Sequence, residues 1–309
     1  MSETLVFEEF TKCQICPRNC GINRNAGQRG FCGLDARLAI ASIIRHRGEE
    51  PPISGDAGIV NVFLMHCNLQ CAFCQNNQIS HNRCATTGFE YTLEKACEEI
   101  ARLLDAGCGA VGFVSPSHYI PYVKAIVHKI RQMGYRVPIV YNTNGYDSVE
   151  EIKALENYID VWLPDFKYSS DALGKKFSKV SDYTQVALAA LKEMYRQKGS
   201  TLLINDHGYA ESGMIIRHLA LPGYVDNSLQ VLDTIAWELS TNVHISLMSQ
   251  YNPKYYQGTD EAMKRTLHAK EYQQVVDKFH ELGFYRGWIQ ELDSYANYNP
   301  DFGQEHPFE

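Results

Sequence analysis

Three cysteines at spacings of four and three, Cys67, Cys71 and Cys74, constrain this chain more than any other feature. They follow the apolar run 59–65, which predicts a buried strand. A loop that presents three thiolates can surround one small metal centre, whereas a closed structural zinc site uses four ligands. Three thiolates suit a four-iron cluster with one iron left open, because a fully ligated cluster takes four cysteines. A partial zinc site or a chance grouping is the alternative.

The cysteine string resembles the CxxxCxΦC signature of the radical S-adenosylmethionine (SAM) enzymes, with Phe73 as the aromatic residue before the last cysteine. Its wider context, from His46 onward, is similar to the uncharacterised branch related to pyruvate formate-lyase activating enzyme. The resemblance covers most of the chain, from residue 13 to about residue 253. It implies that the three cysteines hold a catalytic [4Fe–4S] cluster whose fourth iron takes SAM. It also implies reductive cleavage of SAM to a 5′-deoxyadenosyl radical that abstracts hydrogen from a substrate.

A second group of cysteines lies near the amino terminus. Four cysteines with a close pair and glycine-rich turns can close around one metal centre, and they are Cys13, Cys16, Cys20 and Cys32. A zinc ion with four cysteine ligands fits this spacing. A second, fully ligated [4Fe–4S] cluster fits it equally well. The resemblance does not decide between the two metals.

Length, charge and cysteine usage narrow the functional class. The 309 residues allow one large domain or two modest ones, and 45% hydrophobic content is enough for a full core. A net charge of −7 favours neither a nucleic-acid nor a membrane partner. The start has no apolar signal core and no run reaches transmembrane length, so we expect a cytoplasmic protein. Seven of the ten cysteines fall in the two ligand-like groups, which favours metal binding over disulfides.

Apolar runs and helical periodicities alternate after the cysteine loop. This pattern predicts a parallel sheet with covering helices. Together with the resemblance, it predicts an α/β fold, a partial (β/α)6 barrel of the radical SAM type with a small cysteine-rich amino-terminal module. Predicted strands are 59–65, 110–114, 137–141, 161–163, 214–221 and 243–248, with a seventh at 284–289. Predicted helices cover about 93–104, 123–130, 186–195, 229–239 and 272–282, and a short one begins near 149. We expect three parts, a module and connector (1–58), the barrel (59–290) and a tail (291–309).

Polar residues cluster just after the predicted strands, where an α/β barrel places its site. The resemblance implies that several of them contact SAM. The family's Gly-Gly-Glu stretch is replaced here by residues 113–118, so hydroxyls or carbonyls there would accept from the methionyl ammonium. The expected cofactor-binding residues are Phe73, Ser115, Ser117, Asn144, Asp165, Lys167 and Arg217.

Two enzymatic functions remain open from the sequence. An activase would make a glycyl radical on a partner protein or peptide, and a direct enzyme would act on a small molecule or peptide. A non-catalytic iron–sulfur or zinc regulator is the third reading. For both enzymes the resemblance implies flavodoxin or ferredoxin as the electron donor.

Overall fold

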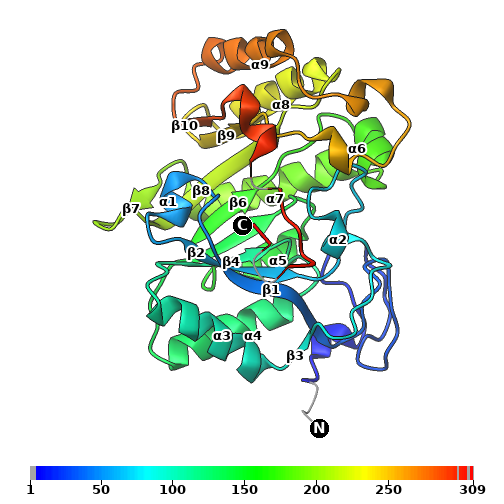
Figure 1. Cartoon of the computed structure of the whole chain (residues 1–309), viewed down its shortest axis with the longest axis vertical. Helices are drawn as coiled ribbons and strands as arrows, with labels where there is room; N and C mark the ends of the chain where they lie inside the picture. The colour runs from blue at the N-terminus through cyan, green and yellow to red at the C-terminus, as the bar shows by residue number, and fades with distance from the viewer. Residues whose placement is uncertain (1–4, 298, 305–306, 309) are drawn as a thin grey trace.

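The computed structural model describes residues 5–297, 299–304 and 307–308, and a single sheet forms its centre (Figure 1). The strands are β1 (Leu38–His46), β2 (Ile59–Leu64), β3 (Glu90–Tyr91), β4 (Val111–Val114), β5 (Ile139–Thr143), β6 (Val161–Pro164), β7 (Leu203–Ile204), β8 (Ala210–Leu219), β9 (His244–Met248) and β10 (Gly287–Ile289). The helices are α1 (Pro51–Ser54), α2 (Asn77–Ser80), α3 (Leu93–Asp105), α4 (Ile120–Gln132), α5 (Val149–Ala154), α6 (Asp171–Ser178), α7 (Tyr183–Lys198), α8 (Val225–Glu238) and α9 (Ala269–Glu281).

The sheet has the strand order β10-β9-β8-β6-β5-β4-β2-β1-β3, with β7 beside β8. Every pair from β2 to β10 along this path is parallel, whereas β1 runs antiparallel to β2 and β3 antiparallel to β1. The path has two different ends, β10 and β3, so the sheet does not close on itself. The predicted α/β fold with a partial barrel is therefore confirmed.

The buried residues explain why these segments form a parallel sheet. All six residues of β2 are buried, as expected for a strand covered on both faces. On α3 the predicted apolar face is buried, and Thr92 caps the helix by accepting a hydrogen bond from the Lys95 amide. Cys97 lies on that face with 1% of its surface exposed, as the helical spacing predicts.

Some elements differ from the prediction. β8 begins at Ala210, four residues before the predicted start, because a turn at 205–208 pairs it with β7 as a hairpin. α6 is a short helix that the periodicity did not indicate. α1 occupies a segment whose residues favour a turn. It forms a short helix because its two prolines fix φ at a value that suits a helix start.

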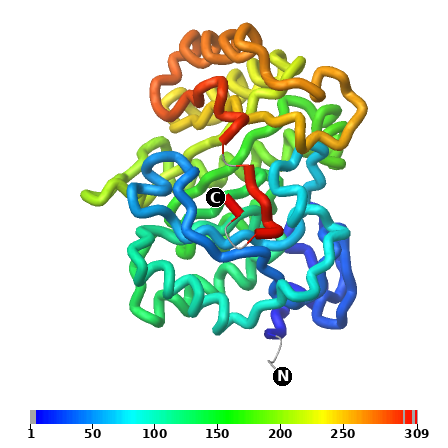
Figure 2. Tube along the Cα trace, in the orientation of Figure 1, coloured from blue at the N-terminus to red at the C-terminus, as the bar shows by residue number. Residues whose placement is uncertain are grey.

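The amino-terminal connector is part of the sheet. β1 lies in the predicted connector, and it pairs antiparallel with β2, the first strand of the barrel. At the other end of the chain, the last residues cross in front of the sheet beside the β1–α1 segment (Figure 2). There Phe302 and Phe308 pack on Phe63, with ring centroids 5.3 and 5.4 Å away. The division at residues 58 and 290 stays a prediction.

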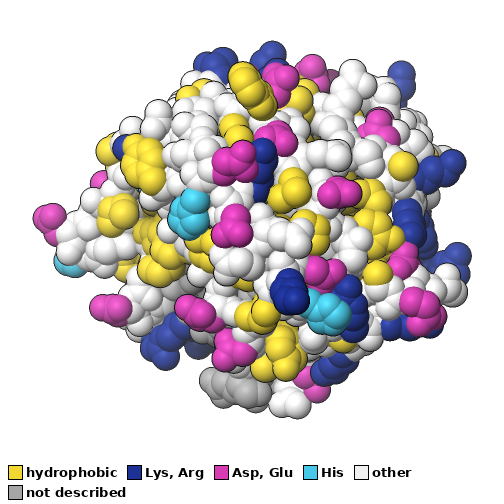
Figure 3. Space-filling view, turned by 90° about the horizontal axis from the view of Figure 1, so that it is seen from above, with side chains coloured by type: hydrophobic (Ala, Val, Ile, Leu, Met, Phe, Trp, Pro, Cys, Tyr) yellow, Lys and Arg dark blue, Asp and Glu magenta, His cyan; other side chains and the backbone are white. Residues whose placement is uncertain are grey.

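On the face shown in Figure 3, the described side chains form no strongly charged patch. Lys and Arg side chains are interspersed there with Asp and Glu side chains. Among the described helices, none is long and apolar enough to cross a membrane.

Candidate active site

A pocket lies at the carboxyl ends of the parallel strands, where the cysteine loop follows β2. We call it the cofactor pocket. It brings together nine of the residues predicted from the sequence, since it is lined by Cys67, Cys71, Phe73, Cys74, Ser115, Asn144, Asp165, Lys167 and Arg217. The ends of β4, β5, β6 and β8 supply the five residues from Ser115 to Arg217 in this list. The prediction that these residues share one site therefore agrees with their position, while their individual roles stay proposals.

His66 turns the chain from β2 into the cysteine loop. Its φ is 64°, a left-handed conformation that is uncommon outside glycine. The ring is buried, with Nδ1 2.7 Å from the carbonyl oxygen of Cys32 and Nε2 3.0 Å from that of Cys84. These contacts tie the start of the loop to the amino-terminal segment, so the loop is held from both sides.

Each sulfur of the cysteine loop has a side-chain hydrogen-bond partner. Asn144 Nδ2 donates to Cys67 Sγ at 3.2 Å, and Ser80 Oγ donates to Cys74 Sγ at 3.2 Å. Cys71 Sγ lies 2.9 Å from the hydroxyl of Ser178. Hydrogen bonds to the sulfurs orient metal-binding thiolates and tune a cluster's reduction potential. Nothing in the local sequence indicates Ser80 or Ser178, because their contacts with the sulfurs form only in the fold.

The thiols of Cys67 and Cys74 keep their protons when no metal is bound. Burial raises the pKa of Cys67 to about 12, and the neighbouring Cys71 adds to this effect. The same two causes raise the pKa of Cys74 to about 11. Because a metal binds the thiolate, binding at this site is coupled to release of protons.

Asn144 joins the end of β5 to the cysteine loop. Besides Cys67, its amide nitrogen donates to Asn68 Oδ1 at 2.7 Å, and its Oδ1 accepts from the Tyr146 amide at 2.9 Å. The next residue, Gly145, has a φ of 81°, and a Cβ there would lie 2.2 Å from the carbonyl oxygen of Asp165. Glycine is therefore required for β5 and β6 to bring their polar ends together.

Asp165 and Lys167 form an ion pair in the pocket wall. Lys167 Nζ lies 2.5 Å from Asp165 Oδ2. Burial alone would lower the pKa of Lys167, but the Asp165 carboxylate outweighs it and raises this pKa above its ordinary value. The pair presents a fixed ammonium and carboxylate side by side, which suits a zwitterionic ligand.

The two predicted serines lie in different places. Ser115, with a φ of 52°, lines the cofactor pocket at the end of β4. Ser117 is fully buried, and its hydroxyl lies 3.4 Å from that of Thr143. It is not among the residues that line the pocket, so the spacing of the two serines did not predict which one faces the ligand.

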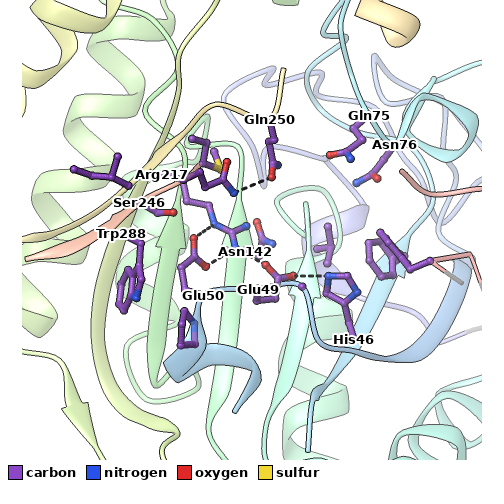
Figure 4. Close-up of a pocket in the computed structure, with 18 residues that line it drawn as sticks. His46, Glu49, Glu50, Gln75, Asn76, Asn142, Arg217, Ser246, Gln250 and Trp288 are labelled. Atoms are coloured by element: carbon purple, nitrogen blue, oxygen red, sulfur yellow. Dashed lines mark hydrogen bonds and ion pairs between the residues drawn. The ribbon is translucent and has the colours of Figure 1, made fainter. Parts of the chain in front are cut away.

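A second cavity adjoins the cofactor pocket, and we call it the side chamber. Figure 4 shows its polar lining. The two cavities share a wall made by Gln75, Asn76, Val114, Asn142, Arg217, Met248 and Gln250. The rest of the chamber comes from residues 46–51, from β9 and β10, and from Phe63 and Phe308. Its position beside the cofactor pocket suits a substrate.

Arg217 lies between the two cavities and is held by two carboxylates. Its Nε donates to Glu50 Oε1 at 2.8 Å, and its Nη2 contacts both Glu50 and Glu49. Asn61 also donates to Glu49, at 2.7 Å. Arg217 Nη1 makes no hydrogen bond to the described residues, so this nitrogen remains the donor that a ligand would meet.

The carboxylate of Glu49 stays ionised. Burial would raise the pKa of Glu49, but Arg217 and His46 lower it to about 2. Burial lowers the pKa of His46, which favours the neutral ring. The sequence around Glu49 and Glu50 indicates only a turn, because nothing local points to Arg217, which lies 167 residues beyond Glu50.

The amino-terminal cysteines lie apart from the cofactor pocket. Cys13, Cys16, Cys20 and Cys32 line one small cavity of their own. His118, which follows β4, lines this second cavity and not the cofactor pocket.

A comparison with protein families decides the class of the protein. The sequence model of the radical SAM superfamily matches residues 61–233. This range includes the cysteine loop and the ends of β4, β5, β6 and β8 that line the pocket. The chain belongs to the radical SAM superfamily. Membership in this superfamily implies a [4Fe–4S] cluster and SAM as cofactors, and it implies radical chemistry of the oxidoreductase type.

The individual proteins that this chain resembles are distant from it. The uncharacterized protein MJ0674 of Methanocaldococcus jannaschii is 29% identical over 255 residues, which cover 80% of this chain and 68% of that protein. SuiB of Streptococcus suis bound to the precursor peptide SuiA has a TM-score of 0.47 at 12% identity, and a pyruvate-formate lyase-activating enzyme domain of Bacteroides vulgatus has a TM-score of 0.38 at 14%. The matches cover 75% and 56% of this chain, and 49% and 93% of those chains. The chain thus spans about half the length of SuiB, and likeness at these scores carries no information on substrate.

The residues of the cofactor pocket fit the radical SAM cofactors. Three cysteines, each with a hydrogen-bond partner at its sulfur, form one wall, and no fourth cysteine lines the pocket within the described residues. The Asp165–Lys167 pair and the open Nη1 of Arg217 lie on the neighbouring strand ends. This donor set can hold a cluster with one open iron next to an amino-acid-like ligand.

Proposed function

We propose that this protein cleaves SAM in the cofactor pocket and removes a hydrogen atom from a substrate in the side chamber. The observation that carries the proposal is that Cys67, Cys71 and Cys74 line the same pocket as Asn144 and the Asp165–Lys167 pair. When bound, the cluster and SAM supply a one-electron cleavage that gives methionine and a 5′-deoxyadenosyl radical. All other roles belong to the residues of the chain.

The pocket residues divide the work of binding. The three cysteines hold three irons, and Asn144, Ser80 and Ser178 fix their sulfurs through hydrogen bonds. Lys167 attracts the SAM carboxylate, while Asp165 and the Ser115 backbone accept from its ammonium.

Two further residues form the sides of the pocket. Phe73 packs against Tyr251, with ring centroids 5.9 Å apart, and shields the cluster edge from water. Arg217 reaches the ligand through Nη1. These assignments rest on position and chemical complementarity.

The first candidate substrate is a glycine of a partner protein or peptide, as in an activase. The sequence resemblance at the strand ends of residues 144, 165, 167 and 217 supports it. The sheet is open, and an open barrel leaves room for a protein loop. A flavodoxin or ferredoxin supplies the electron, and we place the protein in the cytoplasm.

The second candidate is a small polar molecule, and the side chamber favours it. The carboxyl groups of Glu49 and Glu50 face one guanidinium there, so acidic side chains outnumber the basic one in this group. Amide side chains of Asn142, Gln250 and Gln290 add donors and acceptors. A substrate with a positive group, such as an amine, complements this lining.

One experiment separates the two candidates. Reduced protein and SAM are incubated with each glycyl-radical protein of the source organism, and EPR spectra are recorded. A glycyl doublet on one partner supports the activase. If no partner gives a doublet and deuterium passes from a labelled metabolite into 5′-deoxyadenosine, the direct enzyme is correct. If no 5′-deoxyadenosine forms under any condition, the proposal of SAM cleavage is wrong.

A further inference from the structure

The cavity of the amino-terminal cysteines is small, with a free volume of about 10 Å³. Its cysteines span the protein surface and interior, since Cys20 is exposed while Cys13 and Cys32 are buried. A Cβ on Gly30 would lie 2.8 Å from Cys20 Sγ, so glycine keeps this side free for the sulfur. The remaining walls come from Ile15, Arg18, Asn19, Ile22, Arg24, Asn68 and His118.

A buried cation in this cavity has no carboxylate partner among the described residues. Arg24 is 1% exposed. Its guanidinium donates only to carbonyl oxygens, those of Asp35 at 2.8 and 3.0 Å and of His118 at 2.7 Å, and it stacks on Phe10. Isolated buried charges are costly, and native proteins pair them. An anionic group in the cavity, such as metal-bound thiolates, would supply the missing countercharge.

Two buried nitrogens of the same lining also lack a hydrogen-bond partner among the described residues. They are Arg18 Nη2 and His118 Nδ1. His118 Nε2 lies 2.9 Å from the Met65 carbonyl oxygen, which can only accept, so Nε2 carries the proton and Nδ1 offers a lone pair. Orphaned polar atoms are rare in protein interiors. Together with Arg24, they indicate that the cavity is built for a ligand.

The spacing of the cysteines favours a cluster over a single ion. Zn–S bonds of about 2.3 Å require four sulfurs that nearly touch one another. Within the described part of the chain, no three Cys, His, Asp or Glu side chains are close enough to hold one ion, and this applies equally to Cys67, Cys71 and Cys74. The amino-terminal cysteines share this property with the cysteine loop, whose family binds a [4Fe–4S] cluster, and four cysteines fully ligate such a cluster.

The two cysteine sites share Asn68 as a wall. Asn68 lines the amino-terminal cavity, and its carbonyl oxygen accepts from Arg18 Nε at 2.9 Å. On the other side, its Oδ1 lies 3.8 Å from Cys67 Sγ and accepts from Asn144. Asn68 therefore contacts both cysteine sites, and Cys20 is the exposed cysteine of the amino-terminal one.

We propose that Cys13, Cys16, Cys20 and Cys32 hold a second [4Fe–4S] cluster that passes electrons past Asn68 to the cysteine-loop site. A flavodoxin- or ferredoxin-class donor loses one electron at the Cys20 side, the second cluster gains and then releases it, and the cysteine-loop cluster gains it. No bond forms or breaks at the second cluster. Arg18 and Arg24 stabilise its negative charge. The relay rests on the proposed SAM cleavage. The binding of the second cluster at the amino-terminal cysteines does not.

The metal is tested by anaerobic reconstitution of the full chain with iron and sulfide. The variant that changes Cys67, Cys71 and Cys74 to Ala should retain about four irons per chain and a [4Fe–4S] Mössbauer signature, against about eight in the unaltered protein. Reconstitution in the presence of zinc is the comparison. One tightly bound zinc and no iron in the variant would overturn the cluster, and no metal at all would overturn the site. If the variant does not fold, the iron content and Mössbauer signals of the unaltered protein decide, and about four irons would contradict the proposal.

The relay is tested with Cys20→Ala. SAM cleavage driven by reduced flavodoxin should fall by about tenfold, while cleavage driven by dithionite, which reaches the cysteine-loop site directly, should persist. Cys84→Ala, which alters a loop thiol outside both sites, should leave both rates unchanged. Equal loss or equal retention of the two rates in Cys20→Ala would overturn the relay. If the unaltered protein cleaves SAM with neither reductant, the proposed function fails, and the iron content still decides the second site.

Discussion

Asn144 is the side chain that links the strand-end groups to the sulfurs of the cysteine loop. Its amide donates to Cys67 Sγ at 3.2 Å. Such a bond stabilises the more negative, reduced form of a cluster more than the oxidised form. The local pattern of asparagine and glycine after a strand predicted a site residue here, but the sulfur contact depends on a residue 77 positions away.

Replacing Asn144 by Leu should therefore lower the midpoint potential of the cysteine-loop cluster. If the hydrogen bond contributes about 1.4 kcal/mol more to the reduced form, the shift is about 60 mV for one electron. A redox titration followed by EPR measures it. The exposed, remote Asn157→Leu serves as control. An unchanged midpoint in Asn144→Leu would show that the contact does not tune the cluster.

Glu49 provides a pH-dependent stability that can be measured on the metal-free chain. Its pKa is lowered to about 2 in the folded state, so the contribution is fully present above its unfolded pKa of about 4.3 and is lost as the pH falls toward 2. The size is about 3 kcal/mol. The free energy of unfolding should thus fall less between pH 5 and pH 2 in Glu49→Gln than in the unaltered chain. Identical pH dependence would contradict the Glu49–Arg217 pairing.

At the scale of elements, alternating strands and helices were predictable because parallel strands are apolar on both faces and helices keep one apolar face. The β7–β8 hairpin and α6 were not, since short elements carry too few residues to show a period. The polar lining of the side chamber could not be predicted from the sequence either. Arg217 in β8 meets Glu49 and Glu50 before α1, and this contact exists only after the sheet has formed.

The turn after β5 gives a test of how the strand ends are held together. Gly145→Ala combines a left-handed φ with a clash at the Asp165 carbonyl, so it should cost about 3 kcal/mol of unfolding free energy and weaken SAM binding. Gly283→Ala is a matched control, since Gly283 has a φ of 82° and open space around its Cα. That variant should cost about 1 kcal/mol. Urea unfolding and equilibrium dialysis with SAM measure both effects, and equal costs would argue against the close approach of β5 and β6.

At the scale of the molecule, single residues connect the two cysteine sites and the two cavities at the strand ends. The amino-terminal cysteine cavity adjoins the cysteine loop through Asn68, and the cofactor pocket adjoins the side chamber through Arg217. Cysteine spacing indicated both candidate metal sites, because ligand spacing is local, but the contact of Asn68 with both of them follows only from the fold.

The central claim is that the three-cysteine pocket cleaves SAM, and anaerobic reconstitution tests it most directly. The reduced protein should show a four-iron EPR signal that changes when SAM is added, and it should release 5′-deoxyadenosine. Changing Cys67, Cys71 and Cys74 together to Ala should abolish the SAM-dependent change and the product, whereas Cys84→Ala should keep both. Full release of 5′-deoxyadenosine by the triple variant would contradict the account.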